Sequence, residues 1–136
     1  MRWNPHLTFN GQCEAAFKFY EKCLGGTIVM MMSYGDSPMA EQTPLDWRNK
    51  ILHATFALGD QILTGGDAPP GSYEKPRGFS LLLNVAAAEE ADRVFEMLAE
   101  KGEVQLPVQE TFWALRFGIL VDQFGTPWMI NCGNPA

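Results

Sequence analysis

The chain has 136 residues, of which 46% are hydrophobic and 19% charged, and its formal net charge is −6. This composition can bury a real core and excludes a disordered chain. The acidic balance, with lysines and arginines scattered along the chain, excludes binding to a phosphate backbone. No stretch approaches the roughly 18 apolar residues of a membrane span, and the first residues lack the apolar segment of a secretory signal. We therefore expect a cytoplasmic protein without nucleic-acid or membrane partners.

The first half of the chain begins with a strand and a helix. Residues 5–10 alternate between polar and apolar side chains, which is the period of a half-buried strand. The next segment has apolar residues at helical spacing and ends at the glycine pair 25–26, so it predicts an amphipathic helix of about three turns. The apolar residues of this helix are Cys13, Ala16, Phe17, Tyr20 and Leu24. A β-prone stretch follows at residues 27–32.

The middle of the chain contains a loop, a hairpin and a linker. Residues 34–49 show no period and predict a long loop, which we interpret as a lid or an interface arm. Residues 51–58 alternate again, and Gly59-Asp60 turns the chain into residues 61–64, which predicts a hairpin. Residues 67–76 hold three prolines and predict a linker.

The second half repeats the order of the first with a period of about 75 residues. Residues 79–85 predict a strand, and a helix ending at Gly102 follows, then a short strand near Val104 and a hairpin-like pair at 114–121 and 127–132. The apolar stripe of this helix is Ala91, Val94, Phe95 and Leu98. We expect one domain over 1–136, made of module one (1–67), a linker (68–77) and module two (78–136).

Several sequence runs resemble one known family over nearly the whole chain. They are Pro5–Gly11, Leu52-His53-Ala54 before Gly59-Asp60, Gln109–Ala114, Arg116-Phe117-Gly118, Asp122, Phe124-Gly125 and Trp128–Asn131. Together they resemble the PhnB-like branch of the vicinal-oxygen-chelate superfamily, which includes glyoxalase I, bleomycin-resistance proteins and extradiol dioxygenases. The resemblance implies an α+β protein with two βαβββ modules forming a U-shaped mixed or antiparallel sheet around a cleft, in a homodimer.

The resemblance does not bring a reaction with it. Members of this branch are often described as relatives of a ubiquinone methyltransferase. This chain lacks the glycine-rich strand–turn–helix that holds a nucleotide-like cofactor, so we discount methyl transfer.

The metal site of the superfamily can be sought at positions that the resemblance implies. Its enzymes bind a divalent ion through histidine and glutamate side chains on the cleft-facing strands, and those positions fall here on His6, Ser80 and Met129. Only His6 among them is a ligand for Ni, Zn, Fe or Mg, and such sites need several imidazoles or carboxylates. His53 shares a polar face with Thr55 on another strand. We therefore favour no metal cofactor and expect both histidines to be neutral and hydrogen-bonded.

The remaining alternative for a metal is a dimer in which Glu41 or Asp36 of a partner's long loop completes the ligand set. No catalytic residue is assigned.

Other candidates come from the last strands. Arg116 shares the less apolar face of its strand with Ala114 and Gly118, where it either grips an anionic group or forms a salt bridge. Trp113 is the candidate wall for a flat ligand, Trp128 is expected in the core, and Asp122 is expected to cap a turn. The candidate ligand-binding residues are His6, His53, Thr55, Ser80, Trp113, Arg116 and Met129.

Three classes of function fit these observations. The first is a protein that binds a small molecule, as bleomycin-resistance proteins do, without a metal. The second is an enzyme, either a metal-dependent lyase, isomerase or dioxygenase, or one with His6 or His53 as a general base beside Arg116. The third is a subunit with a vestigial cleft. The sequence favours the first, with an anionic or aromatic small molecule as ligand.

Overall fold

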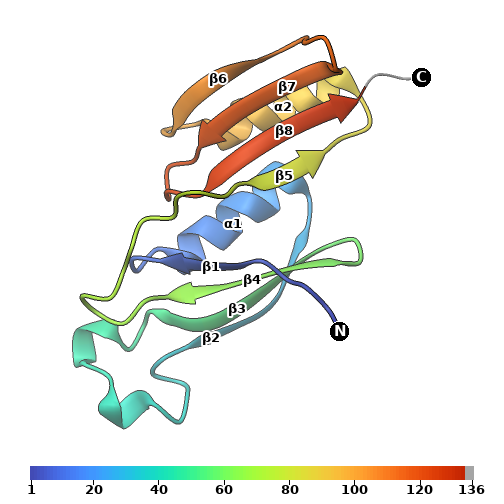
Figure 1. The fold of residues 1–136 in the computed structure, drawn as a ribbon. Helices are drawn as coiled ribbons and strands as arrows, with labels where there is room; N and C mark the ends of the chain where they lie inside the picture. Colours follow the sequence, from blue (N-terminus) through green and yellow to red (C-terminus); the bar gives the residue numbers. More distant parts are fainter. Residues whose placement is uncertain (134–136) are drawn as a thin grey trace. The chain divides into compact units, whose positions relative to one another are not determined.

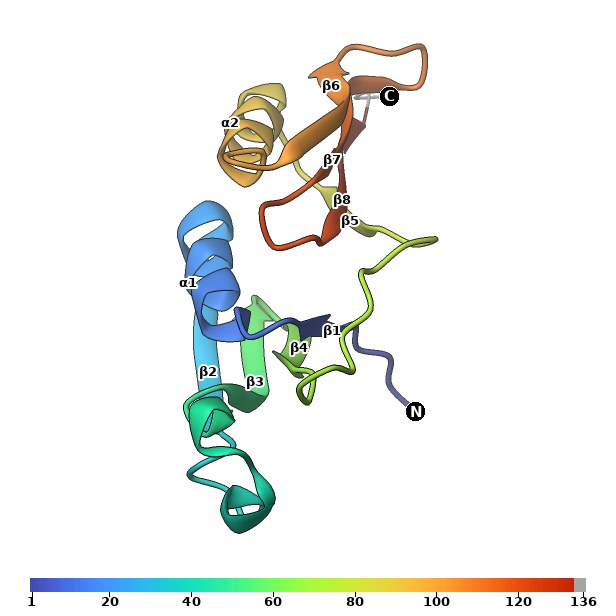
Figure 2. The same cartoon turned by 90° about the vertical axis from the view of Figure 1, so that its left-hand side faces the viewer.

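The computed structural model describes residues 1–133 and divides the chain into two compact units. The boundary lies between Glu74 and Lys75, inside the linker expected at residues 68–77. Each unit holds one four-stranded sheet with one helix packed against one of its faces, which Figure 1 shows along the chain and Figure 2 from the side.

Module one follows the predicted order of strand, helix and three strands. Its elements are β1 (His6–Phe9), α1 (Cys13–Leu24), β2 (Thr27–Ser33), β3 (Ile51–Leu58) and β4 (Gln61–Asp67). The strand order is β1-β4-β3-β2, and β1 is parallel to β4 while the other pairs are antiparallel. The helix ends where Gly25 takes a left-handed φ of 78°, as the glycine pair predicted.

The core of module one lies between α1 and its sheet. Phe17 of α1 packs edge-on against Phe9 and Phe56, with ring centroids 6.1 and 6.2 Å apart. A Cβ added to Gly65 on β4 would lie 2.8 Å from the Phe17 ring, so the glycine allows the helix to approach the sheet. One face of the sheet is therefore fully occupied by α1.

The long loop of module one is tied to the strands at its base. It contains two short 3₁₀ turns, Ala40–Gln42 and Leu45–Trp47. The Tyr34 hydroxyl donates to the backbone oxygen of Asp67 at 2.7 Å, and the Gly35 N–H donates to the Arg48 oxygen at 2.8 Å. Strand β4 continues to Asp67, three residues beyond the hairpin strand predicted to end at residue 64, because Asp67 is buried and hydrogen-bonded.

Module two repeats the same topology. Its elements are β5 (Leu81–Asn84), α2 (Ala88–Leu98), β6 (Glu103–Gln109), β7 (Ala114–Val121) and β8 (Pro127–Gly133). The strand order is β5-β8-β7-β6, with β5 parallel to β8. The buried residues of α2 are the four of the predicted stripe. Strand β5 is shorter than the predicted 79–85.

These two mixed sheets confirm the α+β class and the internal repeat. Each sheet has one face covered by its own helix and one opposite face, which we term the open face. Among residues 1–133, no helix is long and apolar enough to cross a membrane.

Candidate functional site

Strand register places His6 and Thr55 in one row across the open face of module one, and Ser80 in the matching row of module two. In module one, His6 pairs with Thr64 and Thr64 with Thr55. In module two, Pro127 pairs with Val121 and Val121 with Glu103, while Ser80 directly precedes the residue that pairs with Trp128. Paired residues on neighbouring strands point to the same face of a sheet. The row of module one and the row of module two occupy equivalent positions in the repeat.

His53 lies two residues from Thr55 on β3 and completes a histidine cluster made of His6, His53, Thr55 and Thr64. The two imidazole rings stack with centroids 6.1 Å apart and an interplanar angle of 18°. The Nδ1 atom of His6 lies 2.7 Å from the Thr64 hydroxyl oxygen, and the Nε2 atom of His53 lies 3.5 Å from the Thr55 hydroxyl. The structure therefore joins three residues that the sequence predicted and adds Thr64.

The environment of His6 favours its neutral form. Partial desolvation of the ring, and next the charge of His53, lower the pKa of His6 below its ordinary value of 6.5. The Thr64 hydroxyl donates its proton to the Pro5 oxygen at 3.3 Å. The lone pairs of the Thr64 oxygen can therefore accept a hydrogen bond from a proton on His6 Nδ1. This assignment leaves His6 Nε2 as an acceptor for a proton or a ligand group.

Replacing His53 with glutamine should raise the pKa of His6 toward 6.5, because it removes the repulsion between two imidazolium ions while the desolvation remains. Proton NMR titration of the His6 ring measures this change. The exposed Thr8, on the same face, provides a control, and Thr8→Ala should leave the pKa unchanged. An unchanged His6 pKa in His53→Gln would show that the rings do not interact.

The lowered pKa also sets the sign of a pH effect on stability. Below pH 6.5 the unfolded chain binds a proton at His6 that the folded chain resists, so the free energy of unfolding falls as the pH drops from 6.5 through the lowered pKa. Above pH 6.5 this contribution is constant. His53→Gln should make this part of the pH dependence smaller.

The row of module two lies under a groove of about 600 Å³. Its lining comes from the segment before β5 and from one end of the open face. The lining residues are Lys75, Pro76, Arg77, Gly78, Phe79, Ser80, Glu103, Gln105, Val121, Pro127 and Met129. Two of the candidates taken from the sequence, Ser80 and Met129, therefore lie in one groove.

Trp113 lies at a different place in module two. It precedes β7 and is about half exposed, and its ring packs edge-on against Phe112 at 4.7 Å and Phe117 at 5.3 Å. Phe117 pairs with Asn131, two residues along β8 from Met129, on the open face. Trp113 thus extends this face and remains a candidate for contact with a flat ligand.

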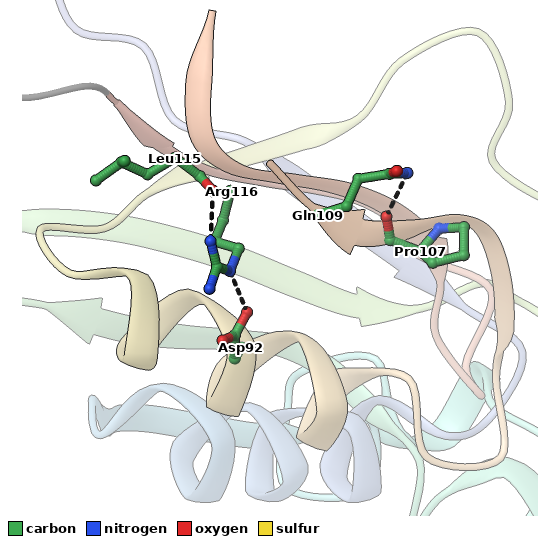
Figure 3. Close-up of polar contacts among 5 residues, drawn as sticks. All are labelled: Asp92, Pro107, Gln109, Leu115 and Arg116. Carbon is green, nitrogen blue, oxygen red and sulfur yellow. Dashed lines mark hydrogen bonds and ion pairs between the residues drawn. The ribbon is translucent and has the colours of Figure 1, made fainter. Parts of the chain in front are cut away.

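The structure corrects the placement of Arg116. Its Nε donates to Asp92 of α2 at 2.9 Å, and its Nη1 donates to the Leu115 oxygen at 2.7 Å (Figure 3). The guanidinium therefore lies on the helix-covered side of the sheet, opposite the face of Met129. A Cβ on Gly118 would lie 2.6 Å from the Phe95 ring, so that glycine makes room for α2 and not for a ligand. Of the two roles considered, Arg116 forms the salt bridge.

Asp122 and Trp128 lie where the sequence predicted. Trp128 is 2% exposed, and its indole N–H donates to Asp122 Oδ2 at 2.8 Å. Asp122 Oδ1 accepts the N–H groups of Phe124 at 2.8 Å and Thr126 at 3.1 Å. The aspartate thus caps the β7–β8 turn and fastens the core tryptophan to it.

The histidines do not assemble a metal site with other residues of the described chain. Within residues 1–133, no three His, Cys, Asp or Glu side chains converge closely enough to hold one ion. His6 and His53 supply two imidazoles, and the equivalent row of module two offers Ser80 and Pro127. This donor set does not fit the three or four ligands of a typical Zn, Ni or Fe site.

The fold assigns the chain to the class of glyoxalase-like proteins. A glyoxylase/bleomycin resistance protein/dioxygenase domain from Frankia sp. EAN1pec is 16% identical, covers 98% of both chains and superposes with a TM-score of 0.66. At this identity the likeness concerns the fold alone.

Closer relatives define the family. The family described as 3-demethylubiquinone-9 3-methyltransferase matches residues 2–131. Protein YjdN of Escherichia coli K12 is 35% identical over 96% of this chain and 95% of its own length. Protein PA1353 of Pseudomonas aeruginosa is 44% identical with a TM-score of 0.90 over 99% of both chains, and a Bacillus cereus PhnB protein is 25% identical with a TM-score of 0.83 over 98% of this chain and 100% of its own. The chain belongs to this PhnB-like family, and its fold is glyoxalase-like.

Proposed function

We propose that this protein binds a small anionic or aromatic molecule on the open faces of its sheets, without a resident metal. The observation that carries the proposal is the groove over the module-two row, whose volume of about 600 Å³ lies in the usual range for small-molecule sites. It combines an apolar floor with a few hydrogen-bonding groups, which is the common composition of such sites.

Two observations support ligand binding over methyl transfer and over metal chemistry. The turns that join strand to helix, residues 10–12 and 85–87, hold a single glycine and so lack the glycine-rich loop of nucleotide-like cofactor sites. The environment of His6 favours a neutral imidazole that can hydrogen-bond to a ligand, and among residues 1–133 too few donors converge for an ion.

A metal-dependent reaction remains the second candidate, because His6 keeps one ring nitrogen free of its threonine contact. Its missing ligands would have to come from another chain. The two candidates differ in their response to metal, and this difference can be measured.

The proposal predicts that the purified protein carries a small organic molecule and no stoichiometric metal. Native mass spectrometry of the protein as isolated should show a mass that exceeds that of the chain by the mass of a small molecule. Elemental analysis should find no bound Zn, Ni, Mn or Fe. Adding these ions should leave the melting temperature unchanged, because an ion that binds the native state would raise it. A rise of several degrees that His6→Ala abolishes would contradict the metal-free proposal.

The same spectra report the assembly, which we propose is a homodimer. Strand β2 is an edge of its sheet and carries no charge, and its Val29 and Met30 are 62% and 40% exposed. An exposed, uncharged edge of this kind is a template for pairing with another chain. A species near twice 15.2 kDa is therefore expected, and a mass of one chain at micromolar concentration would contradict the dimer.

A further inference from the structure

The groove of module two holds two cations that no described residue of the chain neutralises. Lys75 and Arg77, both exposed, belong to the segment that forms one wall of the groove. Across the described residues 1–133, neither side chain has an ion-pair or hydrogen-bond partner, whereas Lys18 pairs with Glu14 and Arg116 with Asp92.

The charge of this groove is opposite to that of the whole chain. Its lining contains two cations and one acid, Glu103, while the protein has 16 acidic and 10 basic residues and a net charge of −6. If charged residues were placed at random in such a chain, the lining would hold more acids than bases. In an acidic protein, a local positive centre offsets the long-range repulsion of an anion. It therefore favours binding of an anion in this groove.

The floor of the groove is apolar. Val121, Pro127 and Met129 lie side by side across β7 and β8, because Pro127 pairs with Val121 and Met129 lies two residues along β8. The Phe79 side chain, 48% exposed, stands in the wall next to them. The flexible side chain of methionine adapts to the shape of an apolar group. The ring of phenylalanine stacks on flat apolar groups.

The polar groups lie at the margins of this floor. Ser80 provides a hydroxyl and Gln105 an amide, and each can donate or accept a hydrogen bond. Gly78 separates Arg77 from Phe79 with a φ of 81°, a conformation that favours glycine. Arg77 and Phe79 flank this turn in sequence, and both line the groove.

From this arrangement we infer that the groove of module two binds a small molecule with one oxyanion group and a flat apolar body, with Arg77 and Lys75 holding the oxyanion over a floor of Val121, Pro127 and Met129. The planar guanidinium of Arg77 matches a carboxylate or sulfonate at two points, and Lys75 adds a second charge. The inference rests on the proposed binding function and names the ligand class and residues for it.

The test uses two dyes with similar aromatic rings and different charge. 1-Anilinonaphthalene-8-sulfonate carries a sulfonate, and N-phenyl-1-naphthylamine lacks it. Arg77→Gln should weaken binding of the sulfonate dye about tenfold, the scale of one charge-assisted hydrogen bond, and leave binding of the neutral dye unchanged. Lys75→Gln should act in the same direction with a smaller change. Arg93→Gln, an exposed arginine of α2 outside the groove lining, is the matched control and should change neither affinity.

Methyl NMR then locates the dye. With ¹³C-methyl methionine, the signal lost in Met129→Leu identifies Met129, and the sulfonate dye should shift that signal. Equal affinity of the sulfonate dye for the wild type and Arg77→Gln, or an unmoved Met129 signal at saturation, would overturn the inference. In either case a small molecule found by native mass spectrometry would still support the proposed function. If the protein carries no small molecule and binds neither dye, both fail.

Discussion

Asp122→Ala should lower the free energy of unfolding by about 3–5 kcal/mol, because it removes the acceptor of three hydrogen bonds in a buried place. The carboxylate is 3% exposed, and one of its oxygens holds the Trp128 indole N–H at 2.8 Å. Alanine leaves this indole and the N–H groups of Phe124 and Thr126 without that acceptor. Urea denaturation followed by circular dichroism measures the loss.

Two further variants separate the hydrogen bonds from the charge. Asp122→Asn keeps one acceptor oxygen and should lose less stability than alanine. Asp46→Ala changes an exposed aspartate and should stay within about 0.5 kcal/mol of the wild type. A loss below about 1 kcal/mol in Asp122→Ala would show that the turn and the tryptophan are held by other contacts.

Most of the fold follows from periodicity that the sequence displays openly. Helix α2 buries the four residues of its predicted stripe, and α1 buries four of its five, with Cys23 buried in place of Leu24. The glycine pair ends α1 as expected. The repeat of strand, helix and three strands is visible because each module must cover one face of its sheet with one helix. The end of β4 was predicted too early, because Asp67 is an acid that is nevertheless buried. The start of β5 was predicted too early, because Ser80 continues the alternation of the open face just before the strand begins.

The face of β7 was misread for a physical reason. Small residues at 114 and 118 suggested open space beside Arg116, but the space belongs to Phe95 of α2. The open face of the same strand carries Phe117, Ile119 and Val121, so polarity alone points to the wrong side. Packing between a helix and a sheet requires small residues where a large ring enters, and a single strand does not reveal this.

The candidate site was found in part for a similar reason. Alternation brought out His6, His53 and Thr55, but Thr64 joins them only through the pairing of β1 with β4. Lys75 and Arg77 lie in a segment that reads as a linker, and only the structure places them beside Ser80. Two cations within three residues, Lys75 and Arg77, were the signal available in the sequence.

Asp67→Ala should cost module one about 3 kcal/mol, because Asp67 joins three segments of chain from a position 4% exposed. Its Oδ1 accepts the N–H of Cys13 at the start of α1 at 3.0 Å, and its Oδ2 accepts the N–H of Ile51 at the start of β3 at 2.8 Å. Without the carboxylate these two buried N–H groups lose their acceptor, and the desolvation that folding imposes on them is no longer offset. Urea denaturation should therefore show a lower midpoint.

A graded pair of variants tests whether the carboxylate is responsible. Tyr34→Phe removes only the hydrogen bond from the Tyr34 hydroxyl to the backbone oxygen of Asp67 and should cost about 1 kcal/mol. Asp36→Ala, an exposed aspartate of the same loop, should have almost no effect. A loss in Asp67→Ala no larger than that in Tyr34→Phe would mean that the carboxylate contributes no more than the single hydroxyl contact, which alanine at this position retains. A loss in Asp67→Ala about three times that of Tyr34→Phe would show that the buried carboxylate of β4 holds the starts of α1 and β3.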